Sequence, residues 1–120
     1  MADHVGAYRV LICGSRDLDD RYPIWCVLNG YLADDLGVVV IEGGALGADR
    51  FARTWAKDNG QPLETYSADW GREGKAAGPL RNQQMLDQGK PQVVWAFVNR
   101  PLERSRGTAD MVHRARAAGV

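Results

Sequence analysis

The stretch 38–56 constrains the fold more than any other part of the chain. It opens with an unbroken run of β-branched residues at 38–41, which is typical of a strand covered on both faces. A glycine-rich turn follows, and a helical pattern begins near Ala48. Such a turn can bring backbone N–H groups and the positive end of a helix dipole to a phosphate. It also fits a structural role in which the glycines only permit close packing. The glycines are Gly43, Gly44 and Gly47.

Composition limits the classes of function. A chain of 120 residues is one domain by size, and it is long enough to form a core without disulfides or metal. Lys+Arg and Asp+Glu balance at 15 each, so the formal net charge is +0. The chain therefore lacks the basic surplus of a sequence-independent nucleic-acid binder. No stretch is apolar enough to span a membrane, and we expect a cytoplasmic protein with no metal and no cofactor. Cys13 and Cys26 lack metal-ligand spacing, and buried free thiols are expected for both.

Strands and helices alternate four times along the chain. This pattern predicts an α/β fold with a Rossmann-like open sheet, mainly parallel, and helices on both faces. We expect residues 1–8 to be a loose end and 9–120 to form a single domain. The chain stops where a further edge strand would begin in this alternation. The expected strands are 9–13, 38–41, 63–67 and 92–98.

The expected helix boundaries follow from capping residues. Asp19 or Asp20 can cap the first helix, with Pro23 in its first turn. That helix should run to about Leu36 and close at Gly37. The second helix should end at Asn59-Gly60. The third should start at Leu80 with Pro79 at its first turn, and the last should begin with Thr108 as N-cap.

Polar loops follow the expected strands. In open parallel sheets, ligands bind at the carboxyl ends of the strands, near the point where strand order reverses. The turn at 14–17 offers a hydroxyl and a guanidinium that suit phosphate, although Arg16 could instead pair with a nearby Asp. The segment 68–79 is too long and polar for a plain connection and is expected to be a lid or binding loop. Its Trp70 could stack on a flat ring.

Four such loops at one sheet edge predict a site for a nucleotide or nucleoside phosphate. Asp49 either caps its helix or faces ribose hydroxyls. Arg81 and Asn82 are expected at a helix N-terminus beside the Trp70 loop. The predicted ligand-binding residues are Gly14, Ser15, Arg16, Asp17, Gly43, Gly44, Gly47, Asp49, Trp70, Arg81, Asn82, Gly107 and Thr108.

Four motifs occur in order: Gly14-Ser15-Arg16 with Asp17, GGALGAD, AGPLRNQQM, and Gly107-Thr108 with Met111. This set resembles the SLOG superfamily, and more closely its YspA-like, cpYpsA-related branch of small bacterial and phage proteins. The resemblance implies a Rossmann-like fold that binds nucleotide-derived ligands. Relatives in the superfamily include the Lonely Guy phosphoribohydrolases and the single-stranded-DNA-binding protein DprA.

The resemblance to the Lonely Guy enzymes implies roles for several positions. Arg81 matches the arginine of their Arg-Lys pair, and Asn82 stands in place of the lysine. Gly107-Thr108 match the Gly-Thr of their second loop. Met111 occupies the position of their catalytic glutamate, and Asp110 is displaced by about 100° around a helix. The resemblance therefore favours binding over turnover.

Three functions are compared on this basis. The first is binding or sensing of a nucleotide-derived small molecule by a homo-oligomer. The second is hydrolysis of a nucleoside monophosphate at its N-glycosidic bond, with catalytic candidates Asp49, Arg81 and Asp110, and with Asp17 as a further acid. The third, single-stranded DNA binding, ranks last because of the zero net charge. It requires one basic stripe formed by Arg72, Lys75, Arg100, Arg104 and Arg106.

Overall fold

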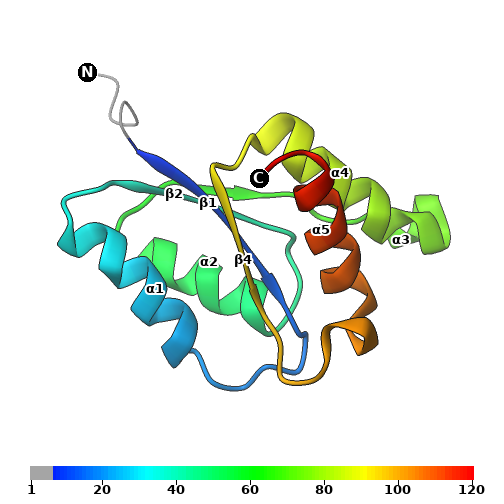
Figure 1. The fold of residues 1–120 in the computed structure, drawn as a ribbon, viewed down its shortest axis with the longest axis horizontal. Coiled ribbons are helices and arrows are strands. Elements are labelled where there is room, and N and C mark those ends of the chain that lie inside the picture. The colour runs from blue at the N-terminus through cyan, green and yellow to red at the C-terminus, as the bar shows by residue number, and fades with distance from the viewer. Residues whose placement is uncertain (1–6) are drawn as a thin grey trace.

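The computed structural model describes residues 7–120. One sheet of four strands runs in the order β3-β2-β1-β4, and every pairing in it is parallel. The predicted Rossmann-like α/β architecture is confirmed (Figure 1). We expected residues 1–8 to be a loose end. Residues 1–6 lie outside the described part of the chain, and Tyr8 belongs to the first strand. The strands are β1 (Tyr8–Gly14), β2 (Val38–Glu42), β3 (Leu63–Thr65) and β4 (Val93–Phe97).

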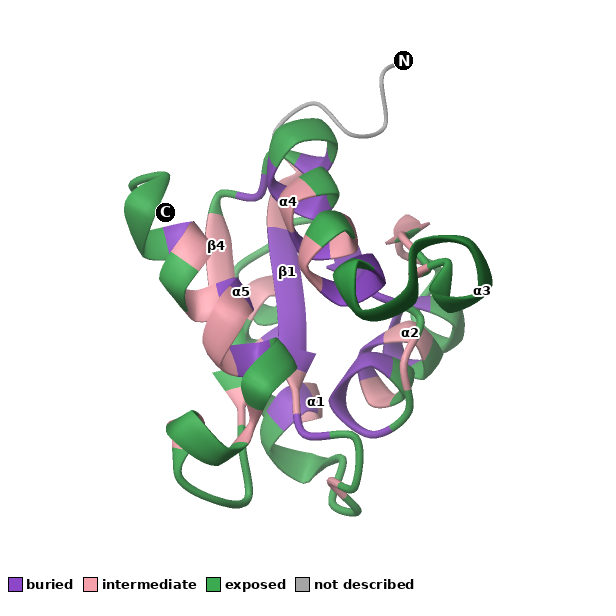
Figure 2. Ribbon diagram, turned by 90° about the vertical axis from the view of Figure 1, so that its right-hand side faces the viewer, coloured by how far each residue is buried: buried purple, intermediate pink, exposed green. Residues whose placement is uncertain are grey.

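Helices cover both faces of the sheet. α1 (Tyr22–Ala33) and α2 (Ala48–Asp58) pack on one face, and α4 (Ala77–Gly89) and α5 (Arg106–Ala117) pack on the other (Figures 1 and 2). Three short helical segments lie in the connections: α3 (Trp70–Glu73), η1 (Gly74–Ala76) and η2 (Leu102–Arg104).

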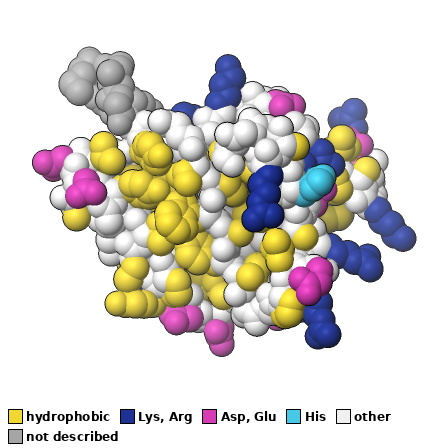
Figure 3. Space-filling view, viewed as in Figure 1, with side chains coloured by type: hydrophobic (Ala, Val, Ile, Leu, Met, Phe, Trp, Pro, Cys, Tyr) yellow, Lys and Arg dark blue, Asp and Glu magenta, His cyan; other side chains and the backbone are white. Residues whose placement is uncertain are grey.

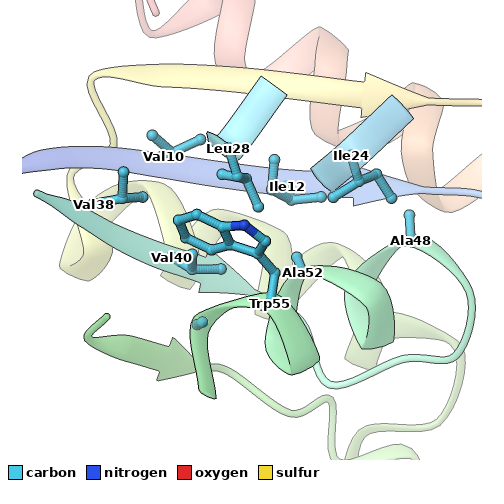
Figure 4. Close-up of a cluster of buried hydrophobic side chains, with 10 residues drawn as sticks. Val10, Ile12, Ile24, Leu28, Val38, Val40, Ala48, Ala52 and Trp55 are labelled. Carbon is cyan, nitrogen blue, oxygen red and sulfur yellow. The ribbon is translucent and has the colours of Figure 1, made fainter. Parts of the chain in front are cut away.

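Alternation along the strands divides the core in two. Val10 and Ile12 of β1 face α1 and α2, whereas Leu11 and Cys13 face α4 and α5. Figure 4 shows the first cluster, in which the fully buried indole of Trp55 packs against side chains of β1 and β2. Its Nε1 donates to Asn29 Oδ1 at 2.8 Å, so the buried polar atom is satisfied. β2 is buried along its whole length, as the run of β-branched residues predicts.

The end of α1 differs from the expectation. The helix stops at Ala33, not at Leu36, and Gly37 is not its cap. Asp35 instead takes the left-handed conformation with a φ of 58°, which Asp tolerates better than most residues. The Leu36 N–H then donates to the Tyr31 carbonyl at 2.9 Å and closes the last turn.

The start of α1 agrees with the expectation only in part. Pro23 lies in the first turn as predicted, but Arg21 occupies the N-cap position and forms no side-chain cap. Asp20 still contributes, because its carboxylate accepts the Tyr22 N–H at 2.9 Å.

The segment 68–79 is largely helical and not the long open loop that we expected. α3 and η1 occupy its middle, and α4 begins at Ala77, three residues before the expected start. Pro79 lies in the first turn of α4 as predicted, where proline is tolerated, but Ala77 and Gly78 belong to the same turn. α2 ends as predicted, with Asn59 at its C-cap.

The two cysteines occupy different environments. Cys13 is a buried free thiol as expected, whereas Cys26 is free and exposed on α1, so the prediction of burial was wrong for Cys26. In the described part of the chain, no helix has the length and apolar character needed to cross a membrane.

Gly47 is the glycine that the fold requires most directly. Its φ is 68°, and a Cβ at this position would lie 2.1 Å from the Ser15 carbonyl oxygen. The contact joins the turn after β2 to the turn after β1, where the Ala48 N–H also donates to the Ser15 carbonyl at 3.3 Å.

We predict that Gly47→Ala lowers the free energy of unfolding by at least about 2 kcal/mol, because it combines backbone strain with a steric clash. Urea unfolding measures the change. Gly60→Ala is the matched control, since Gly60 has a similar φ of 62° but open space around it; it should cost only about 1 kcal/mol. Equal costs for the two variants would contradict this account.

Candidate functional site

A cavity of about 810 Å³ opens at the carboxyl ends of β1 and β4. The chain progresses from β1 to β2 to β3 on one side of β1, and β4 then pairs on the other side. The cavity therefore lies where strand order reverses, the position at which open α/β sheets bind ligands. The turn after β1, the start of α2, α3, α4 and the start of α5 all contribute to its walls.

The structure brings most of the predicted site residues together. Gly43 and Gly44 instead line a smaller neighbouring cavity of about 290 Å³, and Gly47 lines neither cavity. The predicted residues that line the large cavity are Gly14, Ser15, Arg16, Asp17, Asp49, Trp70, Arg81, Asn82, Gly107 and Thr108.

The glycine turn after β2 is held by two carboxylates of the chain itself. Asp49 Oδ2 accepts the N–H groups of Gly43 at 3.1 Å and of Ala45 at 3.2 Å. Glu42 Oε1 accepts the Gly44 N–H at 2.7 Å. The donors that we expected to serve a phosphate are thus engaged within the turn.

Glu42 was missed in the sequence analysis. Its side chain is fully buried, and Oε1 also pairs with Arg53 Nη1 at 2.6 Å, while Oε2 accepts the hydroxyl of Thr65. A buried charge is tolerated only when it is paired and hydrogen-bonded. A glutamate at the end of an apolar strand, directly before two glycines, was the available signal.

Asp49 lies on the wall of the cavity with only 6 % of its surface exposed. Burial raises its pKa to about 6, and the negative charge of Glu42 adds to the effect, while the two N–H donors and Arg81 oppose it. Its second oxygen, Oδ1, has no hydrogen-bond partner within residues 7–120. Asp49 thus holds the glycine turn and does not cap α2, whose N-cap is Gly47 with no side-chain cap. It also presents a carboxylate oxygen at the cavity.

Arg81 and Asn82 connect three elements. Because α4 begins at Ala77, they lie in its second turn and not at its N-terminus as expected. Arg81 Nη1 donates to the Gly43 carbonyl, and Arg81 Nε donates to Asn82 Oδ1 at 3.0 Å. Asn82, 3 % exposed, donates to the Gly107 carbonyl at 3.1 Å. The pair therefore fixes α4 relative to the glycine turn and to the start of α5.

Asp110 belongs to the same network. Its Oδ2 accepts from Asn82 Nδ2 at 3.0 Å and from Arg114 Nε at 2.8 Å. This oxygen is engaged by two donors of the chain.

The start of α5 leaves backbone donors open to the cavity. The helix begins at Arg106, with Ser105 at the N-cap, and no side chain caps it; the prediction of Thr108 as N-cap was therefore wrong. Ala109 is the first residue whose N–H bonds back, to the Ser105 carbonyl at 2.7 Å. The N–H groups at 106–108 have no acceptor within the described residues. Thr108, only 6 % exposed, adds a hydroxyl to the cavity wall.

Arg16 and Asp17 have different surroundings. Asp17 pairs with Arg100 and accepts from Asn99 Nδ2 at 3.1 Å, and these bonds lower its pKa. Arg16 forms no ion pair with any described carboxylate, so the alternative of pairing with a nearby Asp is not observed. Its guanidinium carbon lies instead 5.5 Å from the ring centroid of Trp70, within the range of a cation–π interaction.

Positive charge gathers around the cavity even though the chain is neutral. Three acidic residues line it, Asp17, Asp49 and Asp110, and two of them already pair with arginines. Lys and Arg side chains cluster on the side of the molecule that carries α3 and α5 (Figure 3). The six basic lining residues are Arg16, Lys75, Arg81, Arg100, Arg104 and Arg106.

The floor of the cavity provides little reactive chemistry. Cys13 lines it, but burial raises the pKa of its thiol to about 12, so it is not a thiolate at neutral pH. Within residues 7–120, no three side chains of His, Cys, Asp or Glu gather to hold a metal ion. The arrangement is suited to binding an anion beside one titratable carboxylate.

Asp49→Asn should change how stability depends on pH. A folded-state pKa of about 6, against an ordinary 3.8, means that the stability contributed by protonated Asp49 is lost as pH rises through this window. Relative to that of the parent protein, the free energy of unfolding of the variant should rise by up to about 3 kcal/mol between pH 4 and pH 7. Urea unfolding across this range measures it, and a difference that does not vary with pH would contradict the burial argument.

Comparison with known proteins agrees with this geometry. Residues 8–72 match the YspA, cpYpsA-related SLOG family. The chain is also 43% identical over 122 residues to the Gene 61 protein of Mycobacterium phage D29, an alignment that covers 93% of this chain and 91% of that protein. No solved structure matches. The chain belongs to the YspA, cpYpsA-related SLOG family.

Proposed function

We propose that the large cavity binds a nucleotide or a nucleotide-derived ligand through its phosphate. The observation that carries this proposal is the open start of α5, where the N–H groups at 106–108 have no acceptor among the described residues. A helix N-terminus with free donors is a ready anion site. Arg16 and Arg106 line the same space and supply charge that no described carboxylate neutralises.

The rest of the cavity suits a nucleoside. Asp49 Oδ1 can accept a hydrogen bond from a sugar hydroxyl, because its partner oxygen already serves the glycine turn. The half-exposed indole of Trp70 offers a face for a planar base. Met85 and Met111 also line the cavity, and methionine adapts to flat apolar groups.

A second candidate is hydrolysis of a nucleoside monophosphate at its N-glycosidic bond. The raised pKa of Asp49 favours it, since a carboxyl group with a pKa of about 6 can transfer protons near neutral pH. Asp110 is less suited, because Asn82 and Arg114 already hold one of its oxygens. Met111 supplies no acid at the position of the Lonely Guy glutamate.

Arg16→Gln tests the binding proposal. Arg16 is exposed and makes no ion pair within residues 7–120, so its loss should change the free energy of unfolding by no more than about 0.5 kcal/mol. Calorimetric titration with AMP should nevertheless show at least about tenfold weaker binding, the loss of one charge-assisted contact. Arg50→Gln is the matched control, because Arg50 is exposed on α2 and lines neither cavity.

Equal affinity in the two variants, or no binding of any nucleotide by the parent protein, would refute the proposal. Labelled single-stranded DNA belongs in the same titration series. Tight and strongly salt-dependent binding of DNA with none of mononucleotides would favour the DNA-binding alternative.

Incubation with nucleoside monophosphates tests for turnover. We expect the monophosphate to be recovered intact, because Met111 stands at the position of the Lonely Guy glutamate and one oxygen of Asp110 is held by two donors. Release of free base, measured by chromatography and abolished in Asp49→Asn, would instead establish the hydrolase.

A further inference from the structure

The two cavities share one wall. The smaller cavity has a volume of about 290 Å³, and residues that line both cavities separate it from the large one. This volume is near the lower limit of cavities that hold small molecules, about 300 Å³, so it can take a ring-bearing group no larger than a nucleoside. The residues that line both cavities are Arg16, Ala45, Trp70 and Arg81.

The shared wall carries two positive charges. Arg16 has no carboxylate partner within the described chain, and Arg81 Nη1 donates to a carbonyl oxygen, that of Gly43. Burial lowers the pKa of Arg81; the negative charges of Asp49 and Glu42 oppose this shift, and the positive charge of Arg16 adds to it. An anion that contacts both guanidinium groups would gain charge-assisted hydrogen bonds from each of them.

The smaller cavity is not itself a phosphate site. The N–H groups of Gly43, Gly44 and Ala45, which border it, all donate to Asp49 or Glu42. It offers instead the indole of Trp70, the 63 % exposed side chain of Leu46 and the hydroxyl of Ser67. Together with the guanidinium groups of Arg16 and Arg81, these side chains form a mixed polar and apolar lining, which suits a flat ring that has a polar edge.

We propose that the ligand has two parts joined by a pyrophosphate: a nucleoside in the large cavity, and a second ring-bearing group in the small cavity. The pyrophosphate lies along the boundary that Arg16 and Arg81 form. This inference rests on the proposed function and extends it, since a mononucleotide would fill the large cavity only. The chemical class is a dinucleoside pyrophosphate or a nucleoside diphosphate carrying a further ring.

Calorimetric titration with two probes tests the inference. ADP supplies the pyrophosphate and one nucleoside, and diadenosine pyrophosphate adds the second nucleoside without adding a phosphate. We expect diadenosine pyrophosphate to bind at least about tenfold tighter than ADP. Ser67→Leu, which fills the small cavity, should abolish this advantage and leave the affinity for ADP unchanged.

Two further variants make the result decisive. Ala68→Leu fills the same cavity from the neighbouring residue and replaces Ser67→Leu if that variant unfolds at a lower temperature than the parent protein. Thr54→Leu is the matched control, because Thr54 is exposed on α2 and lines neither cavity; both affinities should stay at their parent values.

The outcomes separate the two proposals. If ADP binds but diadenosine pyrophosphate binds no tighter, or if the small-cavity variants weaken both ligands equally, the two-part ligand is refuted and the nucleotide site stands. If the parent protein binds neither probe and binds no other nucleotide, both proposals are refuted. Both are also refuted if neither probe binds and Arg16→Gln leaves the affinity for every other nucleotide unchanged.

Discussion

Two buried carboxylates hold the glycine turn after β2, and the site depends on this arrangement. Glu42 and Asp49 between them accept three backbone N–H groups of the turn. Hydrogen bonds to a charged acceptor contribute about 1.5–3 kcal/mol each, so the turn is fixed before any ligand arrives. This arrangement disfavours the charged form of Asp49, because burial raises the pKa of its carboxyl group to about 6.

This constraint separates two kinds of glycine. Gly43 packs against Arg81, where a Cβ would lie 2.4 Å from Nη1, and Gly47 packs against the turn after β1. Gly107, in contrast, has open space around it and lies at the start of α5. The first two permit the chain to pack on itself, and only Gly107 borders a place where backbone donors are free. A glycine-rich turn after a buried strand is therefore not by itself a phosphate site, even when it lies at the correct edge of the sheet.

The sequence predicts the fold well because local and long-range signals agree. The β-branched run before Gly43 predicts a fully buried strand, and alternation of strands and helices predicts the parallel sheet. Helix boundaries are less predictable where tertiary contacts decide them. α4 begins at Ala77, three residues before the start expected from Pro79. α1 stops at Ala33, and Asp35 takes the left-handed conformation although Gly37 is the better left-handed residue.

Much of the site could be predicted as a set of residues but not as a set of contacts. The order of strands brings the loops after β1 and β4 together, which is why Ser15 and Thr108 line one cavity. Nothing in the sequence shows that Asp17 pairs with Arg100 while Arg16 stays free of carboxylates. Glu42 was missed because a charged residue at a strand end is usually solvated, whereas here Arg53 and Thr65 compensate its burial.

Backbone amide NMR during a titration with AMP tests the central claim most directly, because it distinguishes engaged donors from free ones. We predict that the largest chemical-shift changes fall on the N–H groups of Arg106, Gly107 and Thr108, and that those of Gly43 and Ala45 change little. Largest changes in the glycine turn, or no changes at the start of α5, would contradict the account.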